Sequence, residues 1–293
     1  MSIFWFIPLV LYLAALLFVI GLLRFSRWRR RRRGQRPPFS DLLLRSPGHG
    51  LGKEIQDISD DISAYLALCC AFPLLFYAMY LSAFRAGPIK IWIPVVFWII
   101  GGAFTLWLIR KTYNLINQRR LLRTGMAGEL ATGEELNRLM LDGYHVYHDF
   151  PADRFNIDHV VVGPQGVFAV ETKARSKRKK GKGDAVVVYD GEQLNFPSWE
   201  TKSPMEQARA LSGWLSKWMS KAVGSRVMVE PVIALPGWYV ERKSSKGVPV
   251  INPKEVKAFF AGRKERVLDE SMIKRICHQL EQKCRDVDMW EWY

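Results

Sequence analysis

The amino-acid sequence predicts an α/β domain with a mixed sheet flanked by helices, attached to a helical region that crosses a membrane three times. Two observations support this prediction. Long uncharged apolar runs are confined to residues 1–109. Residues 110–293 alternate segments of helical spacing with short strand-like segments rich in Val, Tyr and Phe, as expected for a layered α/β fold. A chain of 293 residues has room for two such regions, at about 150 residues per domain.

The membrane region is expected to contain three spans and one basic linker. The apolar runs at residues 3–23, 64–84 and 91–109 are about as long as a bilayer core of about 30 Å requires. A cleavable signal peptide is the alternative for the first run, but its positive charges would precede the apolar segment, and here the arginines follow it. The bias of Lys and Arg toward residues 24–63 predicts a cytoplasmic linker and an N-terminus outside. We therefore expect a multi-pass protein of the bacterial plasma membrane, whose arginine tract meets anionic headgroups.

Residues 110–239 contain the elements of the expected domain, and residues 240–293 add a helical extension. The helix expected over residues 126–141 is ended by Gly143. Ser203-Pro204-Met205-Glu206 has the pattern of a capping box with proline at the first helical position, so a helix is expected to begin there. Strands are expected at residues 144–150, 157–163, 167–173, 185–189 and 227–235, and further helices at 254–260 and 270–285.

Charge and cysteine content restrict the class of protein. The chain carries 43 basic and 28 acidic residues, and this surplus favours polyanionic partners, either lipid headgroups or nucleic acid. The composition excludes a disordered chain, a collagen and a secreted disulfide scaffold. The cysteines match neither a zinc site nor a disulfide framework, so we expect free thiols in a reducing compartment: Cys69, Cys70, Cys277 and Cys284.

The residues that can support catalysis lie in one expected hairpin, around the turn sequence at residues 163–166. If Pro164 and Gln165 form a two-residue loop, Asp158 lies opposite Glu171, with Cβ atoms about 4.5–5.5 Å apart. Lys173 then shares the face of Glu171, because strand side chains alternate. A bulge at residue 166 is the alternative; it shifts the register by one and needs a second bulge to restore the convergence.

Two opposed carboxylates repel each other unless a cation lies between them. Ligands made of oxygen alone suit Mg²⁺ or Mn²⁺. A lysine beside such a metal can orient or deprotonate a water molecule and stabilise negative charge on a phosphate. The pattern therefore favours phosphodiester hydrolysis; the alternative is a pair of exposed strand carboxylates bonded to solvent or to a neighbouring lysine.

The segment NIDHVVVGPQGVFAVETK, residues 156–173, resembles the central signature of the nuclease-related domain (NERD) family, a branch of the restriction-endonuclease-like superfamily with the motif D…(D/E)-x-K. Gly128-Glu129 and Pro204…Gln207 resemble further motifs of that family, and the resemblance covers about residues 122–236. It implies a restriction-endonuclease-like fold. It also implies a metal-dependent nuclease with these roles: Asp158 and Glu171 bind the metal, Glu129 assists it, Lys173 serves catalysis, and Gln207 contacts a phosphate or the attacking water.

Basic and histidine residues surround this motif. The basic run after Lys173 is expected to hold a nucleic-acid backbone without reading its sequence, and a solvated loop is the alternative. His159 is expected on the face opposite Asp158, outside the site. The histidines near the motif are expected to be neutral strand residues: His145, His148 and His159. The basic run comprises Arg175, Lys177, Arg178, Lys179, Lys180 and Lys182.

The sequence thus predicts a membrane-anchored nuclease dependent on Mg²⁺ or Mn²⁺, acting on nucleic acid, DNA more than RNA, at the cytoplasmic face. The alternative is a catalytically silent, membrane-tethered nucleic-acid-binding or scaffold protein. The complete set of Asp158, Glu171 and Lys173 favours the enzyme. A transporter is disfavoured, because the three apolar runs contain no charged residue that could mark a pathway. A second copy of the chain or another membrane protein is a further candidate partner.

Overall fold

The computed structural model describes residue 25 and residues 42–85, 92–177, 185–263 and 267–287. The expected first span, residues 3–23, lies outside the described residues. The chain divides into two compact units. The hairpin unit comprises Met1–Ser40 and Gln56–Arg119, and the α/β unit comprises Asp41–Ile55 and Arg120–Tyr293.

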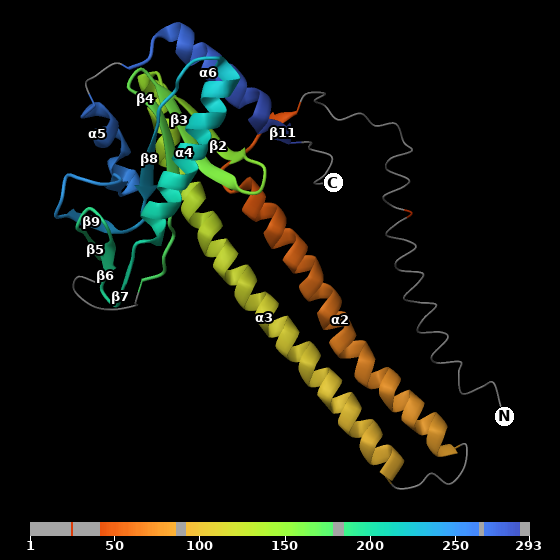
Figure 1. Cartoon of the computed structure of the whole chain (residues 1–293). Coiled ribbons are helices and arrows are strands. Elements are labelled where there is room, and N and C mark those ends of the chain that lie inside the picture. Colours follow the sequence, from red (N-terminus) through yellow and green to blue (C-terminus); the bar gives the residue numbers. More distant parts are fainter. Residues whose placement is uncertain (1–24, 26–41, 86–91, 178–184, 264–266, 288–293) are drawn as a thin grey trace. The chain divides into compact units, whose positions relative to one another are not determined.

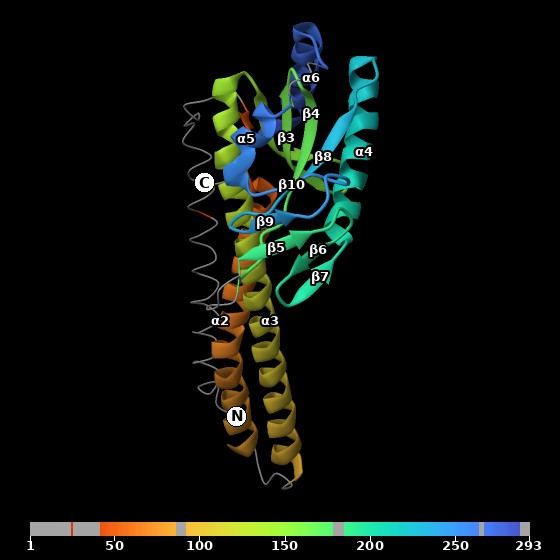
Figure 2. The ribbon, with the colours of Figure 1, turned by 90° about the vertical axis from the view of Figure 1, so that its left-hand side faces the viewer.

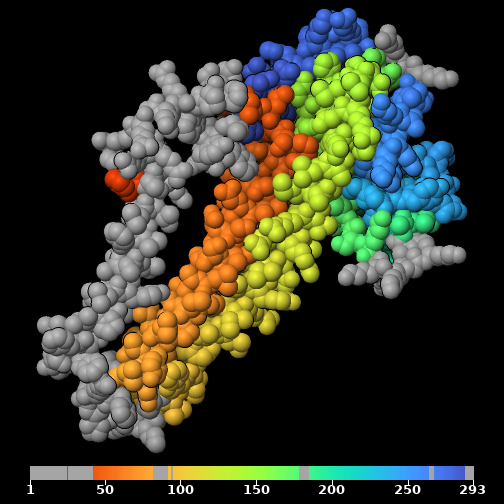
Figure 3. Space-filling view, turned by 180° about the vertical axis from the view of Figure 1, so that it is seen from behind, coloured from red at the N-terminus to blue at the C-terminus, as the bar shows by residue number. Residues whose placement is uncertain are grey.

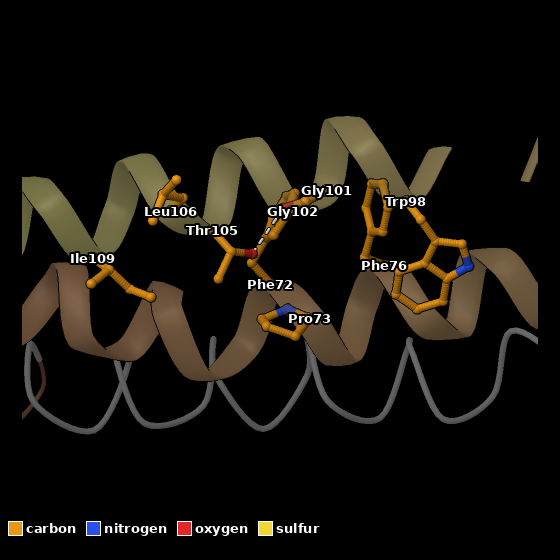
Figure 4. A pocket seen from close by; sticks show the side chains of 9 residues that line it. All are labelled: Phe72, Pro73, Phe76, Trp98, Gly101, Gly102, Thr105, Leu106 and Ile109. Atoms are coloured by element: carbon orange, nitrogen blue, oxygen red, sulfur yellow. Dashed lines mark hydrogen bonds between the residues drawn. The ribbon is translucent and has the colours of Figure 1, made fainter. Parts of the chain in front are cut away.

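Two long helices, α2 (His49–Arg85) and α3 (Trp92–Asn137), supply the hairpin unit. Within the described ranges, these are the two helices long and apolar enough to cross a membrane. They lie side by side (Figures 1 and 3), and the rings of Phe76 and Phe97 stack with centroids 3.8 Å apart. Apolar side chains together with Gly101 and Gly102 line a pocket of about 360 Å³ between the helices (Figure 4). The expected spans at residues 64–84 and 91–109 fall in these two helices.

Both helices extend further than the sequence indicates. The sequence assigns residues 49–63 to a linker and treats residues 126–141 as a separate helix, whereas α2 begins at His49 and α3 continues unbroken to Asn137. Residues 110–124 contain no proline and are rich in Arg, Leu and other good helix formers, so nothing ends the helix there. The segment closes in a 3₁₀ turn, η2 (Arg138–Asp142), with Gly143 in the left-handed region, as expected.

The α/β unit is built on a five-stranded mixed sheet, in the order β10-β8-β4-β3-β2. Neighbours β2, β3 and β4 pair antiparallel, whereas β8 runs parallel to β4 and β10 parallel to β8. The expected mixed sheet is therefore confirmed. The strand bounds are His145–Pro151 for β2, Asn156–Gly163 for β3, Gly166–Thr172 for β4, Val229–Ala234 for β8 and Val250–Ile251 for β10.

A second, four-stranded sheet has the order β7-β6-β5-β9, and of its strands the sequence indicates β5 alone. Its strands are β5 (Val186–Tyr189), β6 (Leu194–Phe196), β7 (Trp199–Thr201) and β9 (Tyr239–Arg242). A third pairing joins β1 (Leu43–Leu44) to β11 (Arg285–Val287), so part of the expected linker belongs to the α/β unit. Strands of two or three residues are too short to show a period of two, which is why the sequence does not reveal them.

Helices cover both faces of the five-stranded sheet (Figures 1 and 2). One face packs against α4 (Ser203–Val223) and α6 (Glu270–Cys284). The other packs against the end of α3, η2 and α5 (Val256–Ala261), which follows the short η3 (Pro253–Glu255). Burial on both faces explains the unbroken apolar runs of the central strands. Alternation then sorts the side chains: Val160, Val162, Val167 and Ala169 face α4, whereas Val161, Phe168 and Val170 face α5.

The start of α4 differs from the expected capping box. The helix begins at Ser203, but Lys202 occupies the N-cap position and no side chain caps it. The Lys202 carbonyl accepts hydrogen bonds from the Met205 and Glu206 N–H groups, at 3.1 and 3.4 Å. The capping-box prediction is therefore wrong, because Ser203 is already helical. All four cysteines are free thiols, as expected, and the reducing compartment stays a prediction.

Candidate active site

The hairpin of β3 and β4 has the simple register. The paired residues run without a shift from Gly163 and Gly166 at the turn to His159 and Val170. Pro164 and Gln165 form the two-residue loop, and Gly166 adopts a φ of 130°, which favours glycine. The ladder ends at the His159–Val170 pair, and the next residues outward in the same register are Asp158 and Glu171. The two-residue-loop prediction is confirmed, and the bulged alternative is wrong.

Asp158 and Glu171 project toward α4, since they alternate in phase with the side chains that pack there. Asp158 is partly buried, and its Oδ2 accepts a hydrogen bond of 2.7 Å from the Thr172 N–H. Glu171 is 4% exposed. The backbone of β4 therefore holds the Asp158 carboxylate by a hydrogen bond, and the Glu171 side chain belongs to β4.

Lys173 and Gln207 complete a closed group around one oxygen of Glu171. The Lys173 Nζ donates to Glu171 Oε1 at 2.7 Å and to Gln207 Oε1 at 2.9 Å. The Gln207 Nε2 donates to the same Glu171 Oε1 at 2.8 Å. The other oxygen, Oε2, is buried and accepts no hydrogen bond from the part of the chain that the structure describes. Since a buried carboxylate oxygen is rarely left unsatisfied, Oε2 is suited to bind a cation.

The electrostatics of the site point the same way. Burial raises the pKa of Asp158 well above its ordinary value, and the charges of Glu171 and Glu129 raise it further. Burial also raises the pKa of Glu129 to about 7, with added repulsion from Asp149 and Glu171. When these carboxyl groups are ionised together, their negative charges repel one another, and a divalent cation would offset that repulsion.

The donor set fits Mg²⁺ or Mn²⁺ rather than zinc. Among the described residues, no three His, Cys, Asp or Glu side chains form a ready metal-binding cluster. Mg²⁺ does not need one, because it commonly binds one or two protein carboxylates and keeps several waters. Asp158 and Glu171, with Oε2 uncommitted, offer that arrangement. The Glu129 carboxylate is instead bonded to the Gly48 N–H, so its expected assistance to the metal stays a prediction.

Comparison with known families gives one match: residues 124–236 match the model of the nuclease-related domain. Residues 124–236 form a NERD domain. The resemblance inferred from the sequence is confirmed, and the matched range contains every residue of the group just described. No curated protein and no solved structure matches the chain.

Gly128 explains how the α3 end of the NERD domain approaches the site. A Cβ at Gly128 would lie 2.5 Å from the Cβ of Ala174 and 3.4 Å from its Cα, so glycine is required for this close packing. The contact fixes α3 against the residue that follows Lys173, and Glu129 is the next residue on the helix. This packing explains why glycine precedes Glu129. Glycine lets α3 approach closely enough for the Glu129 carboxylate to interact electrostatically with Asp158 and Glu171.

A double-mutant cycle tests this packing. Gly128→Ala is expected to destabilise the NERD domain by about 1–3 kcal/mol, since the overpacking outweighs the better helix propensity of alanine. Ala174→Gly in the same chain removes the opposing Cβ and should restore most of the loss. Thermal unfolding of the four proteins in detergent measures the coupling, and equal losses with and without Ala174→Gly would contradict the contact.

A buried histidine pair lies on the opposite side of the sheet. His148 Nδ1 and His159 Nδ1 are 2.9 Å apart, and the chain of hydrogen bonds continues to Asn137 at one end and to the Thr172 hydroxyl at the other. Burial lowers the pKa of His148 to about 4 and that of His159 well below its ordinary value, so both are neutral. His159 is thus outside the site, as expected, but the pair buttresses Thr172, whose N–H holds Asp158. No sequence pattern indicates this network, because it depends on the pairing of β2 with β3.

Two residues of the basic run, Arg175 and Lys177, lie in the described part of the chain. Arg175 lies over the ring of Trp199 and Lys177 over the ring of Trp238, with distances to the ring centroids of 5.6 and 5.7 Å. The other members of the run, Arg178, Lys179, Lys180 and Lys182, lie outside the described residues. The sequence shows the charges but not their aromatic partners, since neither tryptophan lies in the motif.

Proposed function

We propose that the NERD domain hydrolyses phosphodiester bonds of nucleic acid, DNA before RNA, with Mg²⁺ or Mn²⁺ bound between Asp158 and Glu171. One observation carries the proposal: Oε2 of Glu171 is buried without a hydrogen-bond partner among the described residues, while Oε1 is fixed by Lys173 and Gln207. The family match supports a nuclease-related activity. We also propose that this domain has a restriction-endonuclease-like core, in which the β3–β4 hairpin and the parallel β4–α4–β8 unit carry the site.

Each side chain has a distinct role in the proposed reaction. A bound divalent metal would supply a water of lowered pKa and polarise the phosphate. Lys173, held by the oxygens of Glu171 and Gln207, orients the attacking water or donates to a phosphate oxygen on which negative charge develops. Gln207 keeps Glu171 Oε1 occupied, which leaves Oε2 for the metal. Arg175 and Lys177 neutralise phosphates along the strand.

The decisive assay uses full-length protein in detergent with labelled single- and double-stranded DNA and RNA. We expect cleavage with Mg²⁺ or Mn²⁺ and none with EDTA, since the carboxylates alone cannot activate water. Folded protein that binds these substrates and cleaves none of them would instead support the silent nucleic-acid-binding or scaffold protein.

We also propose that α2 and α3 cross the plasma membrane, with residues 86–91 outside and the NERD domain in the cytoplasm. Large apolar side chains face outward along both helices; Leu74, Ile99 and Leu106 are each about two-thirds exposed, at 65%, 64% and 66%. Such a surface is unfavourable in water and suits lipid. The excess of Lys and Arg before α2 orients the pair, and the arginine tract would lie against anionic headgroups.

Labelling of single cysteines in a background without the four native ones tests the topology. Gly87→Cys should react with an impermeant thiol reagent added outside intact cells, and Ser244→Cys should react after the cells are opened. Reaction of Ser244→Cys in intact cells would contradict the proposed orientation.

A further inference from the structure

The second sheet of the α/β unit carries a stack of aromatic rings. Phe196 and Trp199 are directly paired across β6 and β7, and their rings stack with centroids 4.1 Å apart and an interplanar angle of 9°. Phe196 in turn meets the buried Trp238 edge to face at 5.0 Å. Trp199, at the end of this stack, is 40% exposed. The result is a large ring that is fixed from the protein side and open to solvent.

This ring is tied to the candidate active site by the chain that follows Lys173. The Trp238 Nε1 donates to the Arg175 carbonyl at 3.2 Å, which fixes that segment against the second sheet. Arg175 is two residues beyond Lys173, so their Cα atoms are at most about 7 Å apart. Its guanidinium lies 5.6 Å from the centroid of the Trp199 ring. One strand of nucleic acid can therefore contact Lys173, Arg175 and Trp199 together.

The chemistry of this surface selects an unpaired base. Aromatic rings beside arginine bind single strands by stacking on bases, and they do so without reading sequence. In a duplex the faces of the bases are covered by their neighbours, so a tryptophan on a rigid sheet cannot reach them. The adjacent Glu200 does not oppose an anion here, because strand alternation turns it to the other face, where it contacts the Gln193 amide at 3.3 Å.

We propose that Trp199 and Arg175 form a stacking site for an unpaired nucleobase, so that the NERD domain takes single-stranded nucleic acid. Phe196 covers one face of the Trp199 ring and the Arg175 guanidinium lies over it at 5.6 Å. The base stacks on the face that Phe196 leaves free, and the guanidinium moves off the ring to pair with the adjoining phosphate. Lys177 extends the cationic track beside Trp238. The inference rests on the proposed function for its substrate and adds the strandedness of that substrate.

Binding measurements test the site apart from cleavage. Full-length protein in detergent and EDTA is titrated against fluorescein-labelled oligo(dT), oligo(rU) and a DNA duplex, with fluorescence anisotropy as the readout. Trp199→Ala should weaken binding of the single strands about 5- to 100-fold and change duplex binding less than about 2-fold. Phe155→Ala, which removes another exposed aromatic ring, is the matched control and should change neither. The dT and rU arms show whether the single strand is DNA or RNA.

Two further variants keep the test independent of folding. Trp199→Phe retains a ring and should preserve most of the single-strand affinity. Arg175→Gln should lower the salt dependence of single-strand binding by about 0.7 in slope, as loss of one phosphate contact requires. Equal losses of single-strand and duplex affinity in Trp199→Ala, or no loss in either, would overturn the stacking site.

Cleavage by the wild-type protein, measured in parallel, separates the two proposals. Binding that depends on Trp199 without cleavage would uphold the stacking site and remove the nuclease. Cleavage that continues while Trp199→Ala binds single strands normally would do the reverse.

Discussion

Asp158→Asn and Glu171→Gln are each expected to reduce Mg²⁺-dependent cleavage by at least about 10³-fold. Each change removes a negative charge from the site where the cation is proposed to bind. Loss of about 4 kcal/mol of transition-state stabilisation, within the several kcal/mol that a metal supplies, gives this factor. Single-turnover cleavage with saturating protein measures it without interference from product release.

The fold is expected to survive both changes. Because the native pKa of Asp158 is raised, its ionisation destabilises the fold as the pH rises above the unfolded value of about 3.9. The neutral Asp158→Asn variant avoids that loss, so near pH 7 its unfolding temperature should equal or exceed that of the wild type. Asp153→Asn, at an exposed carboxylate in the loop between β2 and β3, is the matched control and should cleave normally. Wild-type cleavage by Glu171→Gln would show that the hairpin carboxylates do not form the site.

Lys173→Ala is expected to lower kcat by about 10²- to 10³-fold and to leave metal affinity unchanged or tighter. The ammonium group acts on the water or the phosphate, while its removal leaves Glu171 more negative. Lys173→Arg should restore only part of the rate, because the planar guanidinium does not lose a proton and reaches differently. Rates at saturating substrate together with a Mn²⁺ titration measure the two effects.

Lys221→Ala, at an exposed lysine in the last turn of α4, controls for loss of a surface charge and should leave kcat unchanged. If Lys173→Ala lost Mn²⁺ binding together with activity, the lysine would be a structural partner of Glu171. If it retained full kcat, the proposed role would be wrong.

The core of the site could be predicted because it is local. A two-residue loop between two apolar strands sets the register, so opposing Asp158 to Glu171 needed only the alternation of side chains. The same alternation put Lys173 beside Glu171 and turned His159 away. The motif resemblance then supplied Gln207, which the structure brings to the Glu171 carboxylate.

The remainder depends on contacts between distant parts of the chain. Arg45 lies in the expected linker, yet its guanidinium pairs with Asp149 at 3.1 Å and with Asp286 at 2.6 Å, which holds residues 42–55 in the α/β unit. Asp149 Oδ2 also accepts the Gly50 N–H in the first turn of α2. The composition of this segment is that of an ordinary linker. The residues that bind it, Asp149 and Asp286, are about 100 and 240 positions away in the sequence, so no local pattern indicates the contact.

Apart from β5, the strands of the second sheet could not be predicted, for a different reason. Its strands are too short to show a period of two in the sequence. The stacking of Trp199 on Phe196, which belongs to the pairing of β6 with β7, is visible in the structure alone. The exposed tryptophan beside the candidate active site is therefore a feature that the structure alone reveals. Likewise, Gly128 shows its importance only through the position of Ala174.

The position of Mn²⁺ in crystals of the full-length protein, located by its anomalous scattering, shows directly whether Asp158 and Glu171 bind the metal. We expect one strong peak between the carboxylates, within direct coordination distance of Oε2 of Glu171 and of an oxygen of Asp158, with water completing the coordination. Loss of the peak in Glu171→Gln crystals would confirm the assignment. Wild-type crystals with an ordered hairpin, Lys173 still bonded to Glu171 and no peak at millimolar Mn²⁺ would show that these carboxylates do not bind the metal.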